Sequence, residues 1–72
     1  MDRFIYGEFR NGNVFIKKLS ANSENDAKER IIRQYWDRFD DLEYDDWENF
    51  LYELADKHDI FLSDELYDVE SL

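Results

Sequence analysis

The chain contains no cysteine, no proline, two glycines and one histidine among its 72 residues. Without cysteine there is neither a disulfide nor a thiolate metal site, and a lone histidine argues against structural zinc. This length allows one small domain, which excludes barrels, nucleotide-binding folds and multidomain enzymes. No apolar run reaches the roughly 18 residues of a membrane span, and the N-terminus does not resemble a signal peptide. We therefore expect a cytoplasmic location, no cofactor and no membrane contact.

The amount of large apolar surface predicts a folded domain despite the high charge. Leu, Ile, Val and Phe make up 20 of the 72 residues, above the roughly 20% below which disorder is expected. Aromatic residues add a further source of buried area, since they form 18% of the chain. A core of this size supplies only about 3–5 kcal/mol of net stability without a disulfide or a metal.

Acidic residues dominate the chain, and they are concentrated in its second half. Nine basic residues stand against nineteen acidic ones, which gives a net charge of −10. Residues 1–38 carry eight basic and six acidic side chains, whereas residues 39–72 carry thirteen acids and a single base, Lys57. Such asymmetry suggests an interaction surface of one sign. Direct binding to nucleic acid is disfavoured, because the acidic half would repel phosphates.

A β-hairpin is predicted over residues 3–19. Two β-rich runs, 4–9 and 14–19, flank Asn11-Gly12, and Asn-Gly is the strongest short signal for a two-residue hairpin turn. This turn pairs Phe9 with Val14 and Gly7 with Ile16. We expect the core face to consist of Ile5, Gly7, Phe9, Val14 and Ile16, with Gly7 allowing a helix to approach closely. The opposite face, which includes Tyr6 and Phe15, is either a second packing layer or an exposed aromatic patch.

Two amphipathic helices are predicted after the hairpin. The first covers residues 23–39, with Ser23 as N-cap and acids in its first turn. Its apolar stripe consists of Ala27, Ile31, Tyr35 and Phe39, flanked by Ile32 and Trp36. The second covers residues 45–58, with Asp45 as N-cap and Glu48 at the third helical position, as in a capping box. Its apolar positions Trp47, Phe50, Leu51, Leu54, Ala55 and His58 follow the helical period.

The C-terminal segment is the least defined part of the pattern. Residues 60–62 are apolar and either anchor on the hairpin or form a third strand. Residues 63–71 then suggest a short acidic helix, which would fray at the terminus. We predict an α+β fold, a single domain over residues 1–72 in which an N-terminal β-hairpin is followed by two or three α-helices.

No motif for a metal or for catalysis is present. An EF-hand loop aligned from Asp37 to Glu48 would place Phe39 and Leu42 where a ligand and a glycine are needed. His58 is explained as a residue of the last helical turn interacting with the helix dipole. A catalytic histidine would need a nucleophile and an orienting partner, and neither is indicated. We predict a non-enzymatic protein with no metal site and no catalytic residue.

The acidic half presents a row of carboxylates that resembles a phosphate backbone. Side chains three and four positions apart on a helix lie about 5–6 Å from each other, close to the separation of phosphates along a nucleic-acid strand. A basic groove built for DNA or RNA would attract such a row, and salt would weaken the attraction. The predicted partner-binding residues are Asp40, Asp41, Glu43, Tyr44, Asp45, Asp46, Glu48, Tyr52, Glu53, Asp56 and Asp59.

In size and charge, residues 37–70 resemble acidic inhibitors of phages and mobile elements. The segment Asp40-Asp41-Leu42-Glu43-Tyr44-Asp45-Asp46 is typical of nucleic-acid mimics among anti-CRISPR and anti-restriction proteins. The resemblance is one of composition and contains no specific motif. It implies an inhibitor that occupies the groove of a basic nucleic-acid-binding protein, such as a nuclease or a CRISPR effector. The basic first half departs from a uniformly acidic mimic.

The same residues are compatible with two alternatives to an inhibitor. An acidic outer face is also what an ordinary solvent-exposed helix presents, and net charge keeps small proteins dissolved. Alternatively, the chain is a small adaptor or regulatory module that binds a protein through its hairpin edge or its exposed aromatic residues. The same edge allows self-association, so a monomer and a homodimer are both compatible with the sequence.

Overall fold

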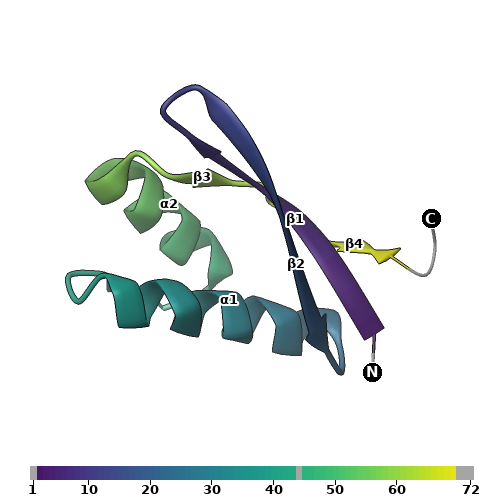
Figure 1. The fold of residues 1–72 in the computed structure, drawn as a ribbon. Coiled ribbons are helices and arrows are strands. Elements are labelled where there is room, and N and C mark those ends of the chain that lie inside the picture. Colours follow the sequence, from purple (N-terminus) through teal and green to yellow (C-terminus); the bar gives the residue numbers. More distant parts are fainter. Residues whose placement is uncertain (1, 44, 70–72) are drawn as a thin grey trace.

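The fold is a twisted antiparallel sheet with two helices on one side. The computed structural model describes residues 2–43 and 45–69. The elements in chain order are β1 (Asp2–Arg10), β2 (Asn13–Ala21), α1 (Glu24–Arg38), α2 (Trp47–His58), β3 (Phe61–Leu62) and β4 (Tyr67–Asp68). In Figure 1 both helices lie on the same side of the long hairpin of β1 and β2, and β3 and β4 follow one another along β1. The hairpin followed by two helices confirms the predicted α+β class.

β1 is the central strand of the sheet. It pairs with β2 on one side and with the short strands β3 and β4 on the other, always antiparallel. Asn11 and Gly12 both adopt positive φ, 53° and 79°, as a type I′ turn requires. The turn sets the register, and the pairs Phe9–Val14 and Gly7–Ile16 are those predicted.

The prediction of which hairpin face is buried was wrong. The helices cover the face that carries Phe4, Tyr6 and Glu8, and these three side chains are buried. Phe9, Val14 and Ile16 of the predicted core face are exposed instead. The alternation of apolar residues led to the wrong face because the face that is buried includes the carboxylate of Glu8, and a charged residue is normally a sign of an exposed face. The buried core consists of Phe4, Tyr6, Ala21, Ala27, Ile31, Ile32, Tyr35, Leu42, Phe50, Leu54, Ile60, Leu62 and Leu66.

Glu8 can be buried because both of its carboxylate oxygens are hydrogen-bonded. The Tyr35 hydroxyl donates to Oε2, and Nη2 of Arg10 donates to Oε1 at 3.0 Å. Only 1% of the Glu8 side chain is exposed, and an isolated carboxylate at such a site would be strongly destabilising. The partners come from α1 and from the end of β1, so this cluster links the sheet to the helix layer.

Both helices are capped by side chains at their N-termini. Ser23 Oγ accepts from the amide of Asp26 at 3.1 Å, which confirms the predicted N-cap of α1. The N-cap of α2 is Asp46 and not Asp45, because Asp46 Oδ1 accepts from the amide of Asn49 at 2.8 Å. Asn49 Oδ1 in turn accepts from the Asp45 amide at 3.2 Å. The arrangement resembles a capping box, but it uses Asn49 instead of the predicted Glu48, and the Asn49 side chain accepts from the residue before the N-cap.

The C-terminal segment joins the sheet, and the short helix predicted over residues 63–71 is wrong for its described part, 63–69. Residues 61–62 form the third strand, which pairs Phe61 with Phe9. Tyr67 then pairs with Ile5 in β4, while Leu66 is buried in the core. Leu66 points inward and Tyr67 outward, which is the alternation of a strand. The backbone of this segment forms its hydrogen bonds with β1, so it does not need the local hydrogen bonds of a helix.

Burial of Tyr6 predicts a loss of stability at alkaline pH. Burial, with the nearby Glu8 carboxylate second, raises the pKa of Tyr6 from 10.0 to about 12. The folded state therefore holds the phenol proton more tightly than the unfolded state. This proton binding adds about 2–3 kcal/mol to the free energy of unfolding below pH 10, and the added stability is lost as the pH rises from 10 to 12.

Urea unfolding measured at intervals from pH 9 to 12 tests this expectation. Tyr6→Phe is the matched control, because it lacks the proton and keeps the ring. The wild-type free energy of unfolding should fall more steeply than that of the variant above pH 10. Parallel curves for the two proteins would contradict the assigned burial of Tyr6.

Candidate protein-binding surfaces

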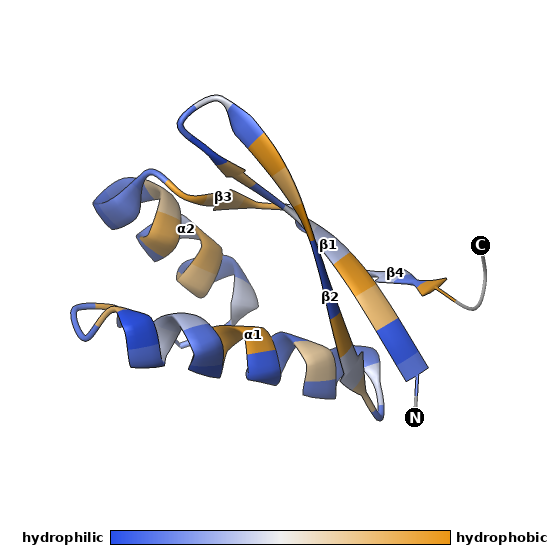
Figure 2. Ribbon diagram, viewed as in Figure 1, coloured by the Kyte–Doolittle hydropathy of each residue, from blue (hydrophilic) through white to orange (hydrophobic). Residues whose placement is uncertain are grey.

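The side of the sheet away from the helices carries a group of exposed apolar side chains, here called the outer sheet face. Cross-strand pairing places Phe61, Phe9 and Val14 in one row and Tyr67 beside Ile5 in another. The large residues of this face that are strongly exposed are Phe9, Val14, Ile16, Phe61 and Tyr67. Their exposed fractions range from 47% for Phe9 to 64% for Ile16. Figure 2 shows hydrophobic residues along both hairpin strands, between a hydrophilic tip and a hydrophilic start of β1.

The outer sheet face is free of acidic side chains in the paired strands. Every second residue of β1 and β2 lies on this face. The charged residues among them are Arg3 and Lys18, and both are basic. In a chain with nineteen acids, this separation leaves an apolar surface with positive charge at one end. Contiguous apolar patches of this kind usually mark interaction sites.

Gly7 lies in the middle of the outer sheet face and is held by backbone contacts. Its amide donates to Ser63 Oγ at 3.1 Å, and its carbonyl accepts from the Ser63 amide at 3.0 Å. A Cβ on Gly7 would meet the Phe9 ring at 3.8 Å, so that ring leans over the glycine. The predicted close approach of a helix at Gly7 was wrong. A distance of 3.8 Å is an ordinary van der Waals contact, so the Phe9 ring does not require a glycine at this position.

β2 forms an open edge of the sheet. Within residues 2–43 and 45–69, β2 pairs with β1 and with no other strand. Its residues from Asn13 to Lys18 are all exposed. Open edges usually carry lysine, which discourages pairing with other copies, and β2 has Lys17 and Lys18 at its centre.

A pocket lies under the tip of the hairpin, on the helix side of the sheet. Its volume is about 380 Å³, and it is lined by Glu8, Arg10, Asn11, Asn13, Phe15 and Lys17. Glu8 is already bound to Tyr35 and Arg10. The buried Nε of Arg10 has no hydrogen-bond partner among the described residues. The Lys17 ammonium stands 5.9 Å from the centre of the Phe15 ring. Among the charged groups of this pocket, Glu8 and Arg10 neutralise each other and Lys17 makes no ion pair with a described residue.

The structure places the predicted partner-binding residues along the α1–α2 loop and on α2. Tyr44 lies outside the described residues. Glu53 is half-buried, and the other nine are exposed. They do not form one row of free carboxylates, because several of these carboxylates bond to other residues of the chain. The exposed members on or beside the helix are Asp45, Asp46, Glu48, Tyr52, Asp56 and Asp59.

Asp41 is held by the end of α2. His58 Nε2 lies 2.8 Å from Asp41 Oδ1, and the Lys57 ammonium donates to the Asp41 carbonyl oxygen at 2.6 Å. The hydrogen bond from His58 holds the pKa of Asp41 below its ordinary value. The His58 ring also stacks on Phe39 at 3.8 Å between centroids. His58 therefore fastens the loop to the helix, a role beyond the predicted interaction with the helix dipole.

Three further acids have structural duties. Glu53 pairs with Lys57 one helical turn later, at 3.2 Å. Asp46 caps α2. Asp59 ends the same helix in the left-handed conformation, with φ of 54°, which aspartate tolerates better than most residues. Glu48, Tyr52 and Asp56 remain as an exposed strip along α2, spaced by one turn each, and they make no ion pair among the described residues.

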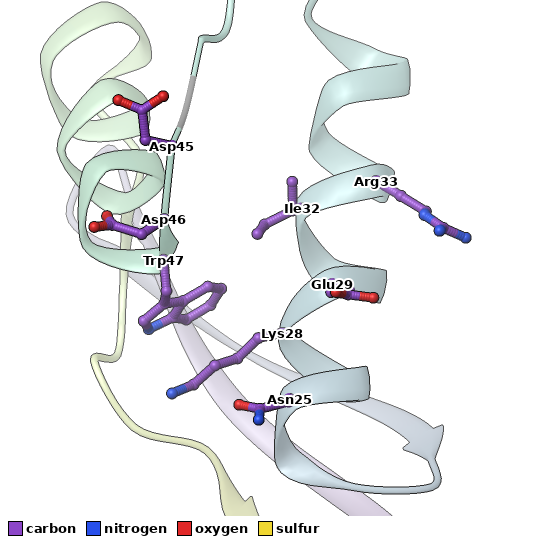
Figure 3. A pocket seen from close by; sticks show the side chains of 8 residues that line it. All are labelled: Asn25, Lys28, Glu29, Ile32, Arg33, Asp45, Asp46 and Trp47. Carbon is purple, nitrogen blue, oxygen red and sulfur yellow. The ribbon is translucent and has the colours of Figure 1, made fainter.

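A cleft lies between α1 and the N-terminal end of α2. It measures about 440 Å³, and Lys28 and Trp47 lie beside each other within it (Figure 3). The Lys28 ammonium stands 5.6 Å from the centre of the Trp47 indole. The other lining residues are Asn25, Glu29, Ile32, Arg33, Asp45 and Asp46. This described lining offers no serine, cysteine or histidine for nucleophilic catalysis.

Comparison with known proteins adds no relative. No protein-family model, curated protein or solved structure matches this chain. Across residues 2–43 and 45–69, no three potential metal-ligating side chains come together, and no helix is long and apolar enough to cross a membrane. Function must therefore be inferred from the surfaces themselves. The sequence pattern did not predict the outer sheet face, because it assigned Ile5, Phe9, Val14 and Ile16 to the core.

Proposed function

We propose that this protein is a non-enzymatic binding module whose protein partner covers the outer sheet face. The observation that carries the proposal is the gathering of exposed apolar side chains on the side of the sheet opposite α1 and α2. These residues are about half exposed: Phe9, Val14, Ile16, Phe61 and Tyr67. Burial of such side chains by a partner is favourable at about 25 cal/mol per Å². Tyr67 and the two phenylalanines are the aromatic anchors that commonly dominate binding energy.

The acidic strip of α2 supports a second candidate function. Glu48, Tyr52 and Asp56 face solvent one turn apart, and this arrangement suits the basic groove of a nuclease or a CRISPR effector. The protein would then act as an inhibitor of the anti-CRISPR or anti-restriction type. This candidate also requires a cytoplasmic location, where such enzymes work. The bonds that engage Asp41 and Glu53 shorten the predicted row and reduce its likeness to a phosphate backbone.

One capture experiment separates the two candidates. Tagged wild-type protein and two variants are used as bait in a lysate of the source cells, and the retained proteins are quantified by mass spectrometry. The first variant carries Phe9→Ser, Ile16→Ser and Tyr67→Ser on the outer sheet face. The second carries Glu48→Lys and Asp56→Lys on the acidic strip. Circular dichroism of both variants checks that the fold is retained.

The proposed function predicts a partner that the outer-face variant loses by at least about tenfold and that the acidic-strip variant retains. Loss with the acidic-strip variant alone would support the inhibitor and contradict binding through the sheet. Equal retention by all three baits would contradict both candidates.

A further inference from the structure

The free edge of β2 has a defined set of unpaired backbone groups. In a hairpin with a two-residue turn, the pair that flanks the turn exchanges both backbone hydrogen bonds, and such pairs recur at every second position. The flanking pair here is Arg10–Asn13. Asn13, Phe15 and Lys17 therefore direct their backbone groups toward β1. The residues between and after them direct theirs away from β1, namely Val14, Ile16, Lys18 and Ser20.

The side chains along this edge are apolar and cationic. Val14 and Ile16 lie on the outer sheet face, with Lys18 next in the same row. Lys17 lies on the other face and lines the pocket under the hairpin tip. Among the described residues, neither lysine forms an ion pair with a carboxylate. A chain that carries a net charge of −10 thus has a local surplus of positive charge along its open strand.

The pocket strengthens the preference for an anionic group. Arg10 lines it together with Lys17, and the buried Nε of Arg10 has an unused donor. Glu8 does not supply the missing acceptor, because Tyr35 and Nη2 of Arg10 occupy its two oxygens. A carboxylate brought in from outside would be attracted by Lys17, whose ammonium makes no ion pair with a described residue.

We infer that β2 accepts an added antiparallel strand from the partner, and that this strand carries two consecutive acidic residues opposite Lys17 and Lys18. Apolar residues opposite Val14 and Ile16 continue the outer sheet face across the added strand. The strand's backbone pairs with the groups that β2 leaves open. This inference rests on the proposed protein-binding function and specifies the chemistry of the partner.

A second copy of the same chain is a poor occupant of this edge. Antiparallel pairing of two β2 strands over all nine residues would place Lys17 opposite Lys17 of the other copy. Like charges directly opposite each other destabilise a strand pair, and two chains of charge −10 also repel. An acidic segment instead places opposite charges against Lys17 and Lys18, and it carries fewer negative charges than a second copy of the chain.

Synthetic peptides test the inference on the full-length protein. The probe is the capped peptide Ser-Thr-Glu-Glu-Val-Thr-Val-Ser, which pairs its glutamates with Lys18 and Lys17 and its valines with Ile16 and Val14. The matched control peptide has lysines in place of the glutamates. Binding is followed by NMR titration and by hydrogen exchange of the β2 amides.

The acidic peptide should bind with a dissociation constant of about 1 mM or below and protect the amides of Val14, Ile16 and Lys18 from exchange. The lysine peptide should bind at least about tenfold more weakly. The variant Lys17→Glu/Lys18→Glu should reverse this preference. Lys18→Pro removes one edge donor while leaving the β1 ladder intact, and it should weaken binding more than Lys18→Ala does.

Several results would overturn the inference. These are no binding of the acidic peptide at millimolar concentration, no preference between the two peptides, or a preference that the double charge reversal leaves unchanged. If the natural partner is lost by the outer-face variant but binds the Lys17→Glu/Lys18→Glu variant normally, strand addition fails while the proposed function stands. If the peptides bind β2 but no partner depends on the outer sheet face, the proposed function fails.

Discussion

Phe50→Ala is expected to lower the free energy of unfolding by about 3–5 kcal/mol. Phe50 is fully buried, and its ring packs 6.1 Å from that of Tyr35 and 5.6 Å from that of Trp47, measured between centroids. The loss is as large as the roughly 3–5 kcal/mol that a core of this size supplies. The free energy of unfolding should therefore fall close to zero, so that at 25 °C a large part of the population is unfolded, with reduced helical circular dichroism and weaker dispersed NMR signals.

Phe9→Ala is the matched control for this prediction. The same side chain is removed, but Phe9 is 47% exposed on the outer sheet face. The expected cost is below about 1 kcal/mol, and the folded spectrum should persist. A cost comparable to that of Phe50→Ala would show that the outer sheet face is covered in the isolated protein, and it would remove the basis for the proposed function.

Glu8→Ala is expected to cost about 3 kcal/mol or more. The substitution leaves the buried Tyr35 hydroxyl without its acceptor and Arg10 without its counter-charge. Removal of one member of a buried pair is destabilising because the other polar groups stay buried. Urea unfolding of Glu8→Ala, compared with Glu29→Ala on the exposed side of α1, measures the effect. The control should change stability by less than about 0.5 kcal/mol.

A double-mutant cycle isolates the Glu8–Tyr35 contact. Glu8→Gln and Tyr35→Phe should each destabilise the protein, and the double variant should lose less than the two single losses added together. Strict additivity would mean that the carboxylate and the hydroxyl act independently, against the hydrogen bond that the structure places between them.

Local chemistry was enough to predict the hairpin and both helices. Asn11 and Gly12 have the positive φ that their turn needs, and the turn then sets the cross-strand pairs. The N-cap at Ser23 could also be predicted, because the Ser23 hydroxyl accepts from an amide only three residues away in the chain, that of Asp26. The one-residue error at the start of α2 has the same local origin, because Asp45 and Asp46 are equivalent caps by type, and Asn49 selects Asp46.

The choice of the buried sheet face could not be predicted from alternation alone. The two faces of the hairpin differ little in apolar content, and Glu8 weighed against the correct one. Glu8 can be buried because the Tyr35 hydroxyl donates a hydrogen bond to it, and Tyr35 lies in a helix 27 positions away in the sequence. The same reasoning applies to the acidic half, where His58 binds Asp41 from 17 positions away and so removes one carboxylate from the predicted row.

Turn type, strand pairing, helix periods and the division of charge between the halves are properties of residues close together in the chain, so they can be read from the sequence. Which face is covered, where the C-terminal segment pairs and which carboxylates stay free depend on contacts between distant residues. Those contacts put Tyr6 and Glu8 inside and leave Phe9 and Ile16 outside. The exposed surface from which we infer function therefore exists only once the helices have packed on the opposite face.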